Sequence, residues 1–546
     1  MKDKEYYSNF ENQRDEHTQN ILGSESKNKI ILAGPGTGKS YLFQQICKNN
    51  IENDLNNNLT LSFINELVND LSKDLHGLSD VKTLHSFALK NISKNTNFFM
   101  NLGDVIQEDY KIIKNKEVSF KDIFYNLEEE KEDELNFYSE RRKFYNFFGP
   151  NCSIYTLIKI FENNEEKIPK YSQILIDEFQ DFNKLESRLI DLLAEKNSMV
   201  IAGDDDQSLY SFKNANPQEI RDKHKSEEYT SFELPFCSRC PEVIINSFHN
   251  IVDKAKAEGF LKDRISKEYK YFPSVEKDLL SSQNPKLIIN KGVYQNQIAF
   301  NIEKEIKSIS DSGKKDFSVL VICSLKSQIK SLEKALRKKG FNNIESPQEK
   351  KGGDLIDGLK LLQKDKECNL GWRIVSKIIL ENNNKDIKDI IKKSHSNLNK
   401  KFYELLDKND VKYIKQVLAI FKKVNENKSL KKEEYQKILD CFGYNQENIV
   451  LEKLKEDFQD NNNQKTNYKN IPIKITTILG SKGLTNDYVF LVNFDDGYLF
   501  GKEKKITDEN ICKFLVALTR AKKKIYLYAN NNKLPTFVNW IDKNNY

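Results

Sequence analysis

The sequence predicts an α/β protein whose parallel sheets bring polar residues to one edge. Three short apolar segments support this prediction, at residues 29–32, 173–176 and 199–202. Each has the pattern of a buried strand, and each ends at a cluster of glycine or acidic residues. Residues 41–47 follow the first strand with the pattern of a helix. Because open parallel sheets bind ligands outside the carboxyl ends of their strands, we expect these clusters to form one site.

Length and charge set the first limits. A chain of 546 residues exceeds one compact domain and predicts about three or four. The formal net charge of +6 is mildly basic, which permits a nucleic-acid surface without requiring one. No segment approaches the roughly 18 apolar residues that span a bilayer, and residues 1–10 lack the apolar stretch of a secretion signal. We therefore expect a soluble, cytoplasmic protein with no membrane partner.

The cysteines give a weak indication of metal binding. Eight are scattered along the chain, and Cys237 and Cys240 form the one close pair. A structural zinc site usually needs a second pair or a nearby histidine, and neither accompanies this pair. Reduced thiols in a cytosolic protein are the simpler interpretation.

The glycine-rich segment at residues 33–40 predicts a phosphate-binding loop. Its glycines let backbone N–H groups curl around phosphate oxygens, and the helix that follows adds a favourable dipole. Lys39 would reach the β- and γ-phosphates, while the Ser40 hydroxyl would ligate Mg²⁺. Ala33 replaces the first glycine of the general pattern. The residues predicted to contact nucleotide are Ala33, Gly34, Pro35, Gly36, Thr37, Gly38, Lys39 and Ser40.

The second and third strands end in carboxylates that such a loop requires. Asp177 would hold Mg²⁺ through its water shell, and Glu178 would act as general base on the attacking water. The third strand runs into residues 203–210, which contain three aspartates and Gln207. Three strands that deliver polar residues at their carboxyl ends predict a nucleoside triphosphatase.

With these residues in place, the chain resembles the UvrD/Rep/PcrA-type superfamily 1 DNA helicases. The family's motifs follow one another in order from about residue 19 to residue 524. Beyond the phosphate-binding loop, the matching segments are residues 61–65, 83–87, 177–181, 203–212, 234–244, 481–484 and 516–521.

The resemblance implies two RecA-like P-loop NTPase domains with ATP between them. The first domain would supply the phosphate-binding loop, Asp177, Glu178 and Gln207. The second would supply Arg239 and Arg520, whose guanidinium groups would touch the γ-phosphate when the domains close. Gly483 would also line the nucleotide. A glutamine reads adenine in this family; Gln19 has the better spacing for that role, and Gln13 is a rival.

The resemblance also predicts the domain boundaries. The first RecA-like domain would comprise residues 1–89 and 169–233, and the second residues 234–345 and 469–546. Residues 90–168 and 346–468 would be helical insertions similar to the family's 1B and 2B subdomains. Apolar patterns at residues 316–323, 473–478, 488–492 and 524–528 predict strands of the second sheet.

A path for single-stranded nucleic acid is predicted from aromatic and polar residues in the motifs. Successive bases stack on aromatic rings in such proteins. Phe63, Tyr210 and Phe212 stand at the family's stacking positions, although core packing is an alternative for Phe63. Lys213 replaces the usual arginine. The remaining predicted contacts are Asn65, Thr83, His85 and Ser481. The lysine pairs at 422–423 and 431–432 would touch a duplex or form a solvated helix face.

Several motifs depart from the family pattern. Cys237 and Ser238 precede Arg239 where the family has Asn-Tyr, so the aromatic that stacks on adenine is missing, and Phe236 is out of register. Thr485 stands where a glutamate is usual, and Leu479 and Gly480 precede Ser481 in place of a histidine. These changes indicate a divergent branch. We expect no fused nuclease domain after Arg520, and the compact layout resembles the helicase subunit of the Gabija antiviral system.

The leading hypothesis is an ATP-dependent 3′-to-5′ helicase or translocase on single-stranded DNA, or on DNA with a 3′ single-stranded tail. ATP and Mg²⁺ would be its cofactors, and a nuclease would be a suitable protein partner. The alternative is a nucleotide-gated sensor of DNA ends that regulates a partner without processive unwinding. A third hypothesis is an RNA motor, because no residue distinguishes recognition of a 2′-hydroxyl from its absence.

Overall fold

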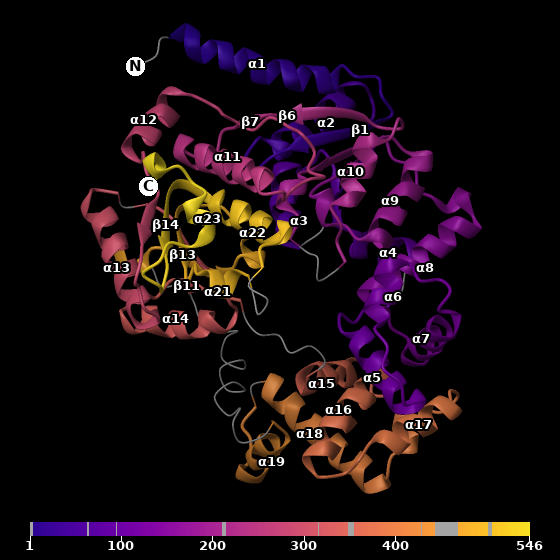
Figure 1. Ribbon diagram of the computed structural model, residues 1–546. Coiled ribbons are helices and arrows are strands. Elements are labelled where there is room, and N and C mark those ends of the chain that lie inside the picture. The colour runs from indigo at the N-terminus through magenta and orange to yellow at the C-terminus, as the bar shows by residue number, and fades with distance from the viewer. Residues whose placement is uncertain are drawn as a thin grey trace. The chain divides into compact units, whose positions relative to one another are not determined.

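The chain forms two compact units in the computed structural model (Figure 1). The structure describes residues 4–62, 65–93, 96–209, 214–314, 316–347, 354–426, 428–442, 468–500 and 505–546. Unit 1 comprises residues 1–87, 158–348 and 465–546, and unit 2 comprises residues 88–157 and 349–464. Each unit is therefore assembled from segments far apart in the sequence.

Unit 1 contains two six-stranded sheets, and the first carries the predicted site. Its spatial order is β3-β2-β4-β5-β1-β6, and every neighbouring pair is parallel. The strands are β1 (Asn28–Ala33), β2 (Asn58–Ser62), β3 (Asp80–Thr83), β4 (Gln173–Ile176), β5 (Met199–Gly203) and β6 (Thr230–Leu234). The three strands predicted from the sequence are β1, β4 and β5, and they are adjacent. The predicted convergence of their carboxyl ends follows directly from this order.

The helices around the first sheet follow the βα alternation of a parallel fold. They are α1 (Lys4–Leu22), α2 (Lys39–Glu52), α3 (Asn65–Asp74), α4 (Leu84–Ile92), α9 (Lys184–Lys196) and α10 (Gln218–Lys225). The core between helices and sheet includes Ile31, Leu42, Phe43, Leu175 and Val200, all at most 1% exposed. Apolar strand residues and the apolar face of α2 thus meet as their sequence periods predict.

The second sheet repeats the same architecture. Its order is β11-β12-β10-β13-β14-β9, again with parallel neighbours. The strands are β9 (Ile288–Asn290), β10 (Val319–Cys323), β11 (Ile344–Glu345), β12 (Ile473–Thr477), β13 (Asn486–Val492) and β14 (Ala521–Tyr528). The helices are α11 (Glu242–Ala257), α12 (Val275–Gln283), α13 (Gln295–Asp311), α14 (Ser327–Lys338), α21 (Asp496–Leu499), α22 (Asp508–Leu518) and α23 (Thr536–Asn539). The predicted α/β fold with two parallel sheets is confirmed.

Two short parallel strands, β7 and β8, pair outside the large sheets. β7 (Phe236–Cys237) pairs with β8 (Lys270–Tyr271). The pairing places the residues before Arg239 beside the segment that follows α11.

Unit 2 is built from helices contributed by both of its segments. They are α5 (Leu102–Lys114), α6 (Phe120–Asn126), α7 (Glu132–Tyr145), α15 (Leu355–Lys364), α16 (Asn369–Asn382), α17 (Lys388–Ser396), α18 (Lys408–Asn425) and α19 (Lys432–Phe442). The boundaries of the unit fall within α4 and α8 (Pro150–Asn163). The two lysine pairs named above are in this unit, and Lys422 and Lys423 pair with Glu426 and Glu434.

A buried charge cluster links the two segments of unit 2. Asp109 on α5 accepts hydrogen bonds from Arg141 on α7, with Nη2 to Oδ2 at 2.6 Å, and from Arg373 on α16, with Nε to Oδ1 at 2.9 Å. The Tyr145 hydroxyl also donates to Asp109, and Arg373 reaches Glu108 at 3.2 Å. Burial disfavours the Asp109 carboxylate, but Arg373 and Arg141 more than offset this and hold its pKa below the ordinary value.

We predict that Asp109→Asn destabilises unit 2 by about 3–5 kcal/mol, because it leaves buried guanidinium groups without their shared carboxylate. Urea unfolding of the full chain, followed by circular dichroism, would show an earlier helical transition. The matched control is Glu117→Gln, which breaks an exposed ion pair with Lys111 in the same unit. An equal effect of both variants would contradict the prediction.

The same carboxylate predicts a pH dependence. Because its folded pKa is lowered, the ionised Asp109 stabilises the unit at neutral pH, and this stabilisation declines as the pH falls towards the folded pKa. The stability difference between wild type and Asp109→Asn should therefore narrow on acidification.

Candidate nucleotide-binding site

The phosphate-binding loop has the geometry that its glycines predict. Gly36 and Gly38 have φ of 75° and 96°, in the left-handed region that glycine tolerates. A Cβ on Gly36 would overlap the Cβ of Arg239, so this position also needs glycine for space. Helix α2 begins immediately after Gly38, which contributes no side-chain cap. The first N–H groups of α2 are thus open to an anion.

The carboxylates that follow β4 lie close to this loop. Lys39 Nζ is 2.9 Å from Glu178 Oε1, and Gln180 Nε2 donates to Glu178 Oε2 at 2.6 Å. Glu178 has φ of 55°, an uncommon conformation for a residue with a side chain. Strained residues of this kind concentrate at functional sites, where surrounding contacts hold them.

The pKa values of the two adjacent carboxylates are shifted in opposite directions. Burial and the neighbouring Glu178 charge raise the pKa of Asp177 to about 7. Burial opposes ionisation of Glu178 as well, but the ammonium groups of Lys39 and Lys482 more than offset it and lower its pKa. Glu178 is therefore the ionised member, which is the form that a general base needs.

Lys482 brings a cation from the second sheet into this cluster. It lies between β12 and β13, is 4% exposed, and was not singled out from the sequence. Its Nζ is 2.5 Å from Asp181 Oδ2 and 3.5 Å from Glu178 Oε2, and it donates to the Gln207 carbonyl at 2.6 Å. Lys482 lies in the 481–484 motif. The sequence predicted ligand contacts in this motif only for Ser481 and Gly483.

Arg520, Arg239 and Gln207 complete the site. Arg520 Nη2 donates to Gln207 Oε1 at 3.3 Å, and its Nε donates to the Val516 carbonyl at 2.9 Å. Burial and the nearby Arg239 guanidinium lower the pKa of Arg520 to about 10. Two guanidinium groups that repel each other beside a phosphate-binding loop suit a polyanion. The structure thus brings together the predicted catalytic set of Lys39, Asp177, Glu178, Gln207, Arg239 and Arg520.

Tyr269 is a further contact that the sequence did not indicate. Its hydroxyl donates to the Pro35 carbonyl at 2.8 Å, and its ring lies against Gly34. The side chain is buried and follows α11 by a dozen residues, so no local pattern connects it with the loop. Tyr269 braces the loop from outside the motif.

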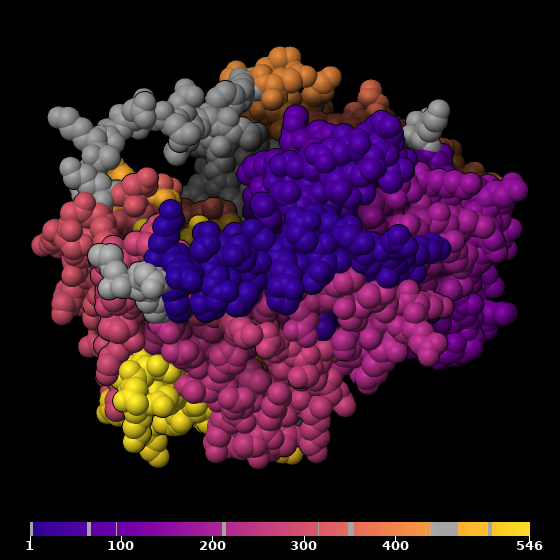
Figure 2. Space-filling view, turned by 90° about the horizontal axis from the view of Figure 1, so that it is seen from above, coloured from indigo at the N-terminus to yellow at the C-terminus, as the bar shows by residue number. Residues whose placement is uncertain are grey.

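The adenine end of the site remains a prediction. Gln13 and Gln19 are both exposed on α1, which lies across the surface of unit 1 in the view of Figure 2. Phe236, out of register in the sequence, is buried and packs edge-on against Phe10, with ring centroids 5.9 Å apart. Its ring therefore belongs to the core and does not replace the missing stacking aromatic.

The predicted nucleic-acid contacts are only partly described. Phe63, Tyr210, Phe212 and Lys213 lie outside the described residues, as does the side chain of Asn65 at the start of α3. The Thr83 hydroxyl accepts from the Ser86 N–H at 3.1 Å and caps α4. Ser481 is fully buried and donates to the Ile478 carbonyl at 2.7 Å. His85 is half-buried on α4. Contacts of these residues with nucleic acid remain predictions.

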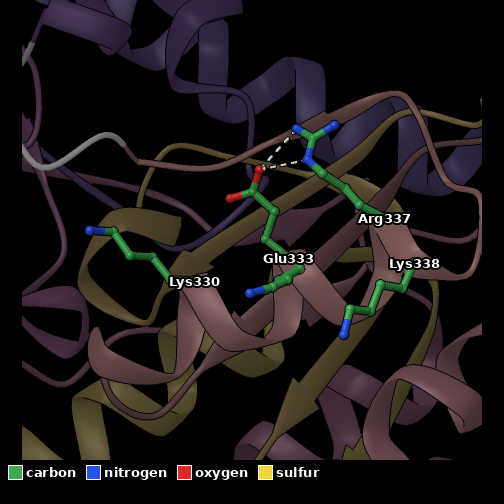
Figure 3. Close-up of a pocket in the computed structure, with 5 residues that line it drawn as sticks. Lys330, Glu333, Arg337 and Lys338 are labelled. Atoms are coloured by element: carbon green, nitrogen blue, oxygen red, sulfur yellow. Dashed lines mark hydrogen bonds and ion pairs between the residues drawn. The ribbon is translucent and has the colours of Figure 1, made fainter. Parts of the chain in front are cut away.

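A separate surface pocket runs along α14 (Figure 3). It is lined by Lys330, Glu333, Lys334, Arg337 and Lys338. Arg337 pairs with Glu333 at 2.9 Å and donates to the Ile344 carbonyl at 3.0 Å. These bonds hold the segment after α14 in place. None of the lining residues belongs to the phosphate-binding loop or to the segment 177–181 that carries the carboxylates.

Comparison with known families finds two matching segments. Residues 105–228 match the UvrD/REP helicase N-terminal domain, and residues 446–532 match the UvrD-like helicase C-terminal domain. Two segments of the chain are thus similar to the two domains of UvrD-like helicases. All eight of its cysteines are buried as free thiols. Among its described helices, none is both long and apolar enough to cross a membrane.

Individual relatives extend this result. The chain is 27% identical over 426 residues to the ATP-dependent DNA helicase Rep of Buchnera aphidicola subsp. Acyrthosiphon pisum, covering 65% of this chain and 62% of the relative. It is 36% identical over 104 residues to DNA helicase II of Haemophilus influenzae, covering 18% and 14%. An ATP-dependent helicase/nuclease subunit from Streptococcus sanguinis is 34% identical over 98 residues, covering 17% and 8%. The chain thus spans less than two thirds of each relative's length.

We predict that Gly36→Ala weakens nucleotide binding at the candidate site at least about tenfold, equivalent to about 1.4 kcal/mol. The added Cβ would displace Arg239 and would lie 3.2 Å from Cys237 Sγ. Titration with a fluorescent ATP analogue measures the change in Kd.

Gly77→Ala is the matched control. Gly77 has the same φ of 75°, but a Cβ there meets no atom within 4 Å. Both variants carry the left-handed backbone strain of about 1–2 kcal/mol. Equal loss of binding in both would assign the effect to strain and refute the steric argument.

Proposed function

We propose that the chain is an ATP-dependent DNA helicase or translocase that moves 3′ to 5′ on single-stranded DNA. One observation carries the proposal. The cluster at the carboxyl ends of β4 and β5 is completed by Lys482 and Arg520, which flank strands of the second sheet. Hydrolysis at such a site depends on the contact between the two sheets, so it can be coupled to their relative movement. The direction of movement rests on the family resemblance.

ATP would be held first by the loop. Its phosphates would accept from the N–H groups at the start of α2, and Lys39 would leave Glu178 for the β- and γ-phosphates. Once released, Glu178 would accept a proton from the attacking water. Arg239 and Arg520 would stabilise negative charge on the γ-phosphate.

Mg²⁺ fits the same residues. Asp177 Oδ1 is buried and has no hydrogen-bond partner among the described atoms. Ser40 is the second residue of α2 and follows Lys39, whose charge interacts with Asp177. The side chains of Asp177 and Ser40 would hold the ion, directly or through its water shell, and the ion would neutralise charge between the phosphates.

The proposed substrate is single-stranded DNA or DNA with a 3′ single-stranded tail, and the proposed location is the cytoplasm. Relatives named as helicase/nuclease subunits support a nuclease as protein partner. The altered motif before Arg239, with Phe236 packed in the core, favours the nucleotide-gated DNA-end sensor as second candidate.

We predict that single-stranded DNA stimulates ATP hydrolysis. Lys39→Ala and Glu178→Gln should abolish this DNA-stimulated hydrolysis. Loss of a general base costs about 100- to 10,000-fold in rate. Glu178→Gln should still bind nucleotide, whereas Lys39→Ala should bind it weakly. Lys48→Ala, an exposed change on the same helix α2, is the control and should hydrolyse ATP normally.

Strand separation on a duplex with a 3′ tail distinguishes the two candidates. Unwinding would support the helicase. DNA-stimulated hydrolysis that leaves the duplex intact and moves no bound roadblock would support the sensor. Hydrolysis indifferent to DNA would refute the motor, and competition with RNA strands would test the choice of nucleic acid.

A further inference from the structure

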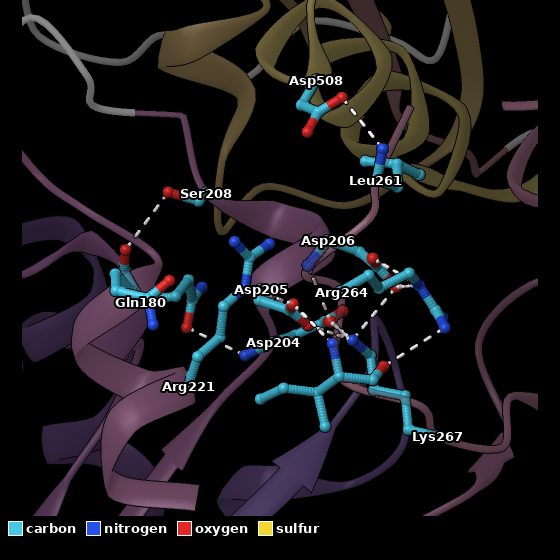
Figure 4. Close-up of polar contacts among 12 residues, drawn as sticks. Gln180, Asp204, Asp205, Asp206, Ser208, Arg221, Leu261, Arg264, Lys267 and Asp508 are labelled. Atoms are coloured by element: carbon cyan, nitrogen blue, oxygen red, sulfur yellow. Dashed lines mark hydrogen bonds and ion pairs between the residues drawn. The ribbon is translucent and has the colours of Figure 1, made fainter. Parts of the chain in front are cut away.

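The segment between α11 and β8, residues 258–269, contacts the catalytic cluster at a point that no motif marks. We call it the bridging loop. Figure 4 shows Arg264 and Lys267 of this loop among three consecutive carboxylates, Asp204, Asp205 and Asp206. The carboxylates follow β5, and all three are at most 2% exposed.

The three carboxylates are neutralised by three basic side chains. Lys267 Nζ is 2.8 Å from Asp204 and 3.1 Å from Asp206, and it also pairs with Asp205. Arg264 Nε is 2.7 Å from Asp206, and Arg221 Nε is 3.1 Å from Asp205. The carboxylate oxygens lie within 4.8 Å of one another, as in a metal site, but protein cations already occupy their faces. The cluster is an ion network rather than a metal centre.

Lys267 is the central member of this network. Its side chain is 4% exposed. Burial opposes its charge, but the three carboxylates more than offset this and raise its pKa above the ordinary value. A buried charge network is costly to desolvate and is weak evidence for stability as such. We therefore ask which catalytic groups this ion network orients.

Asp204 connects Lys267 with the catalytic residues. One oxygen, Oδ1, faces Lys267, and the other, Oδ2, accepts from Gln207 Nε2 at 2.9 Å. This bond turns Gln207 Oε1 towards Arg520, which donates to it at 3.3 Å. The Asp204 N–H donates to Gln180 Oε1 at 3.0 Å, and the amide of Gln180 holds Glu178.

The bridging loop is also tied to the helix that precedes Arg520. The Leu261 N–H donates to Asp508 Oδ1 at 3.0 Å in the first turn of α22 (Figure 4). The Ile265 N–H donates to Asp205 Oδ2 at 2.9 Å. The loop thus holds both the strand end that carries Gln207 and the helix that ends just before Arg520.

We propose that Lys267 is a positioning residue for ATP hydrolysis, which acts through Asp204 to hold the Gln207 amide in the orientation used at the γ-phosphate. The inference rests on the proposed function, because it assigns Gln207 a role in hydrolysis. Lys267 itself pairs with the three aspartates and would not contact nucleotide or the attacking water.

The test compares Lys267→Met with wild type in DNA-stimulated hydrolysis. Misplacement of one catalytic group by about 1 Å can cost on the order of 100-fold, so kcat should fall about 10- to 100-fold. KM for ATP should change less than about threefold, because the loop and Lys39 remain in place. Lys267→Arg, which keeps the charge, should recover part of kcat. Lys270→Met, an exposed change in β8 beside the bridging loop, is the control and should match wild type.

A double-mutant cycle separates positioning from general destabilisation. If Lys267 acts through Gln207, then Lys267→Met should lower kcat no further in a Gln207→Ala background. If the losses of kcat in the two single variants multiply in the double variant, the proposal is overturned. A Lys267→Met variant with a lowered Tm but unchanged kcat would also overturn it. Lys267→Gln carries the same cycle if Lys267→Met does not fold. A wild-type protein that does not hydrolyse ATP would refute the proposed function instead, which is a distinct result.

Discussion

The carboxylates at the carboxyl ends of β4 and β5 are buried, and a buried negative charge must be paired with a cation for the fold of unit 1 to be stable. Six lie there, each at most 8% exposed: Asp177, Glu178, Asp181, Asp204, Asp205 and Asp206. Burial raises the pKa of Asp177 to about 7 and that of Asp181 to about 6, which shows how poorly the region tolerates further negative charge. The first sheet supplies Lys39 and Arg221, and the other cations arrive from the bridging loop and the second sheet. Neutralising these acids therefore holds the two sheets together.

ATP adds negative charge to this balance. Lys39 pairs with Glu178, and Arg520 is held by Gln207 next to Arg239. In the proposed function, a triphosphate would attract the same cations. Its arrival would withdraw Lys39 from Glu178 and relieve the repulsion between the two guanidinium groups. Binding and release of nucleotide would then change the partners of residues on both sheets in turn. Such an exchange is a physical route from hydrolysis to movement, because each partner change alters a contact between the sheets.

The sequence predicted those parts of the site that are local. The phosphate-binding loop, Asp177-Glu178 and the three adjacent strands each follow from short patterns of apolar and glycine residues. Lys482, Lys267 and Tyr269 were missed because their partners are far away in the chain: Lys267 meets Asp204 across 63 positions, and Tyr269 meets Pro35 across 234. An isolated lysine or tyrosine has no periodicity that reveals a buried partner. The Thr83 hydroxyl caps α4 by accepting from the Ser86 N–H, and its predicted contact with nucleic acid stays a prediction.

Unit 2 places a further constraint on any such movement. One of its segments interrupts the chain between β3 and β4 of the first sheet, and the other interrupts it between β11 and β12 of the second. Asp109 and Arg373 join these segments through a buried hydrogen bond within one compact unit, whose chain continues into both sheets. If the separation of the sheets changes, we expect the buried pair to stay intact, because breaking a buried ion pair costs about 3–5 kcal/mol. The two insertions are thus expected to respond to ATP together rather than separately.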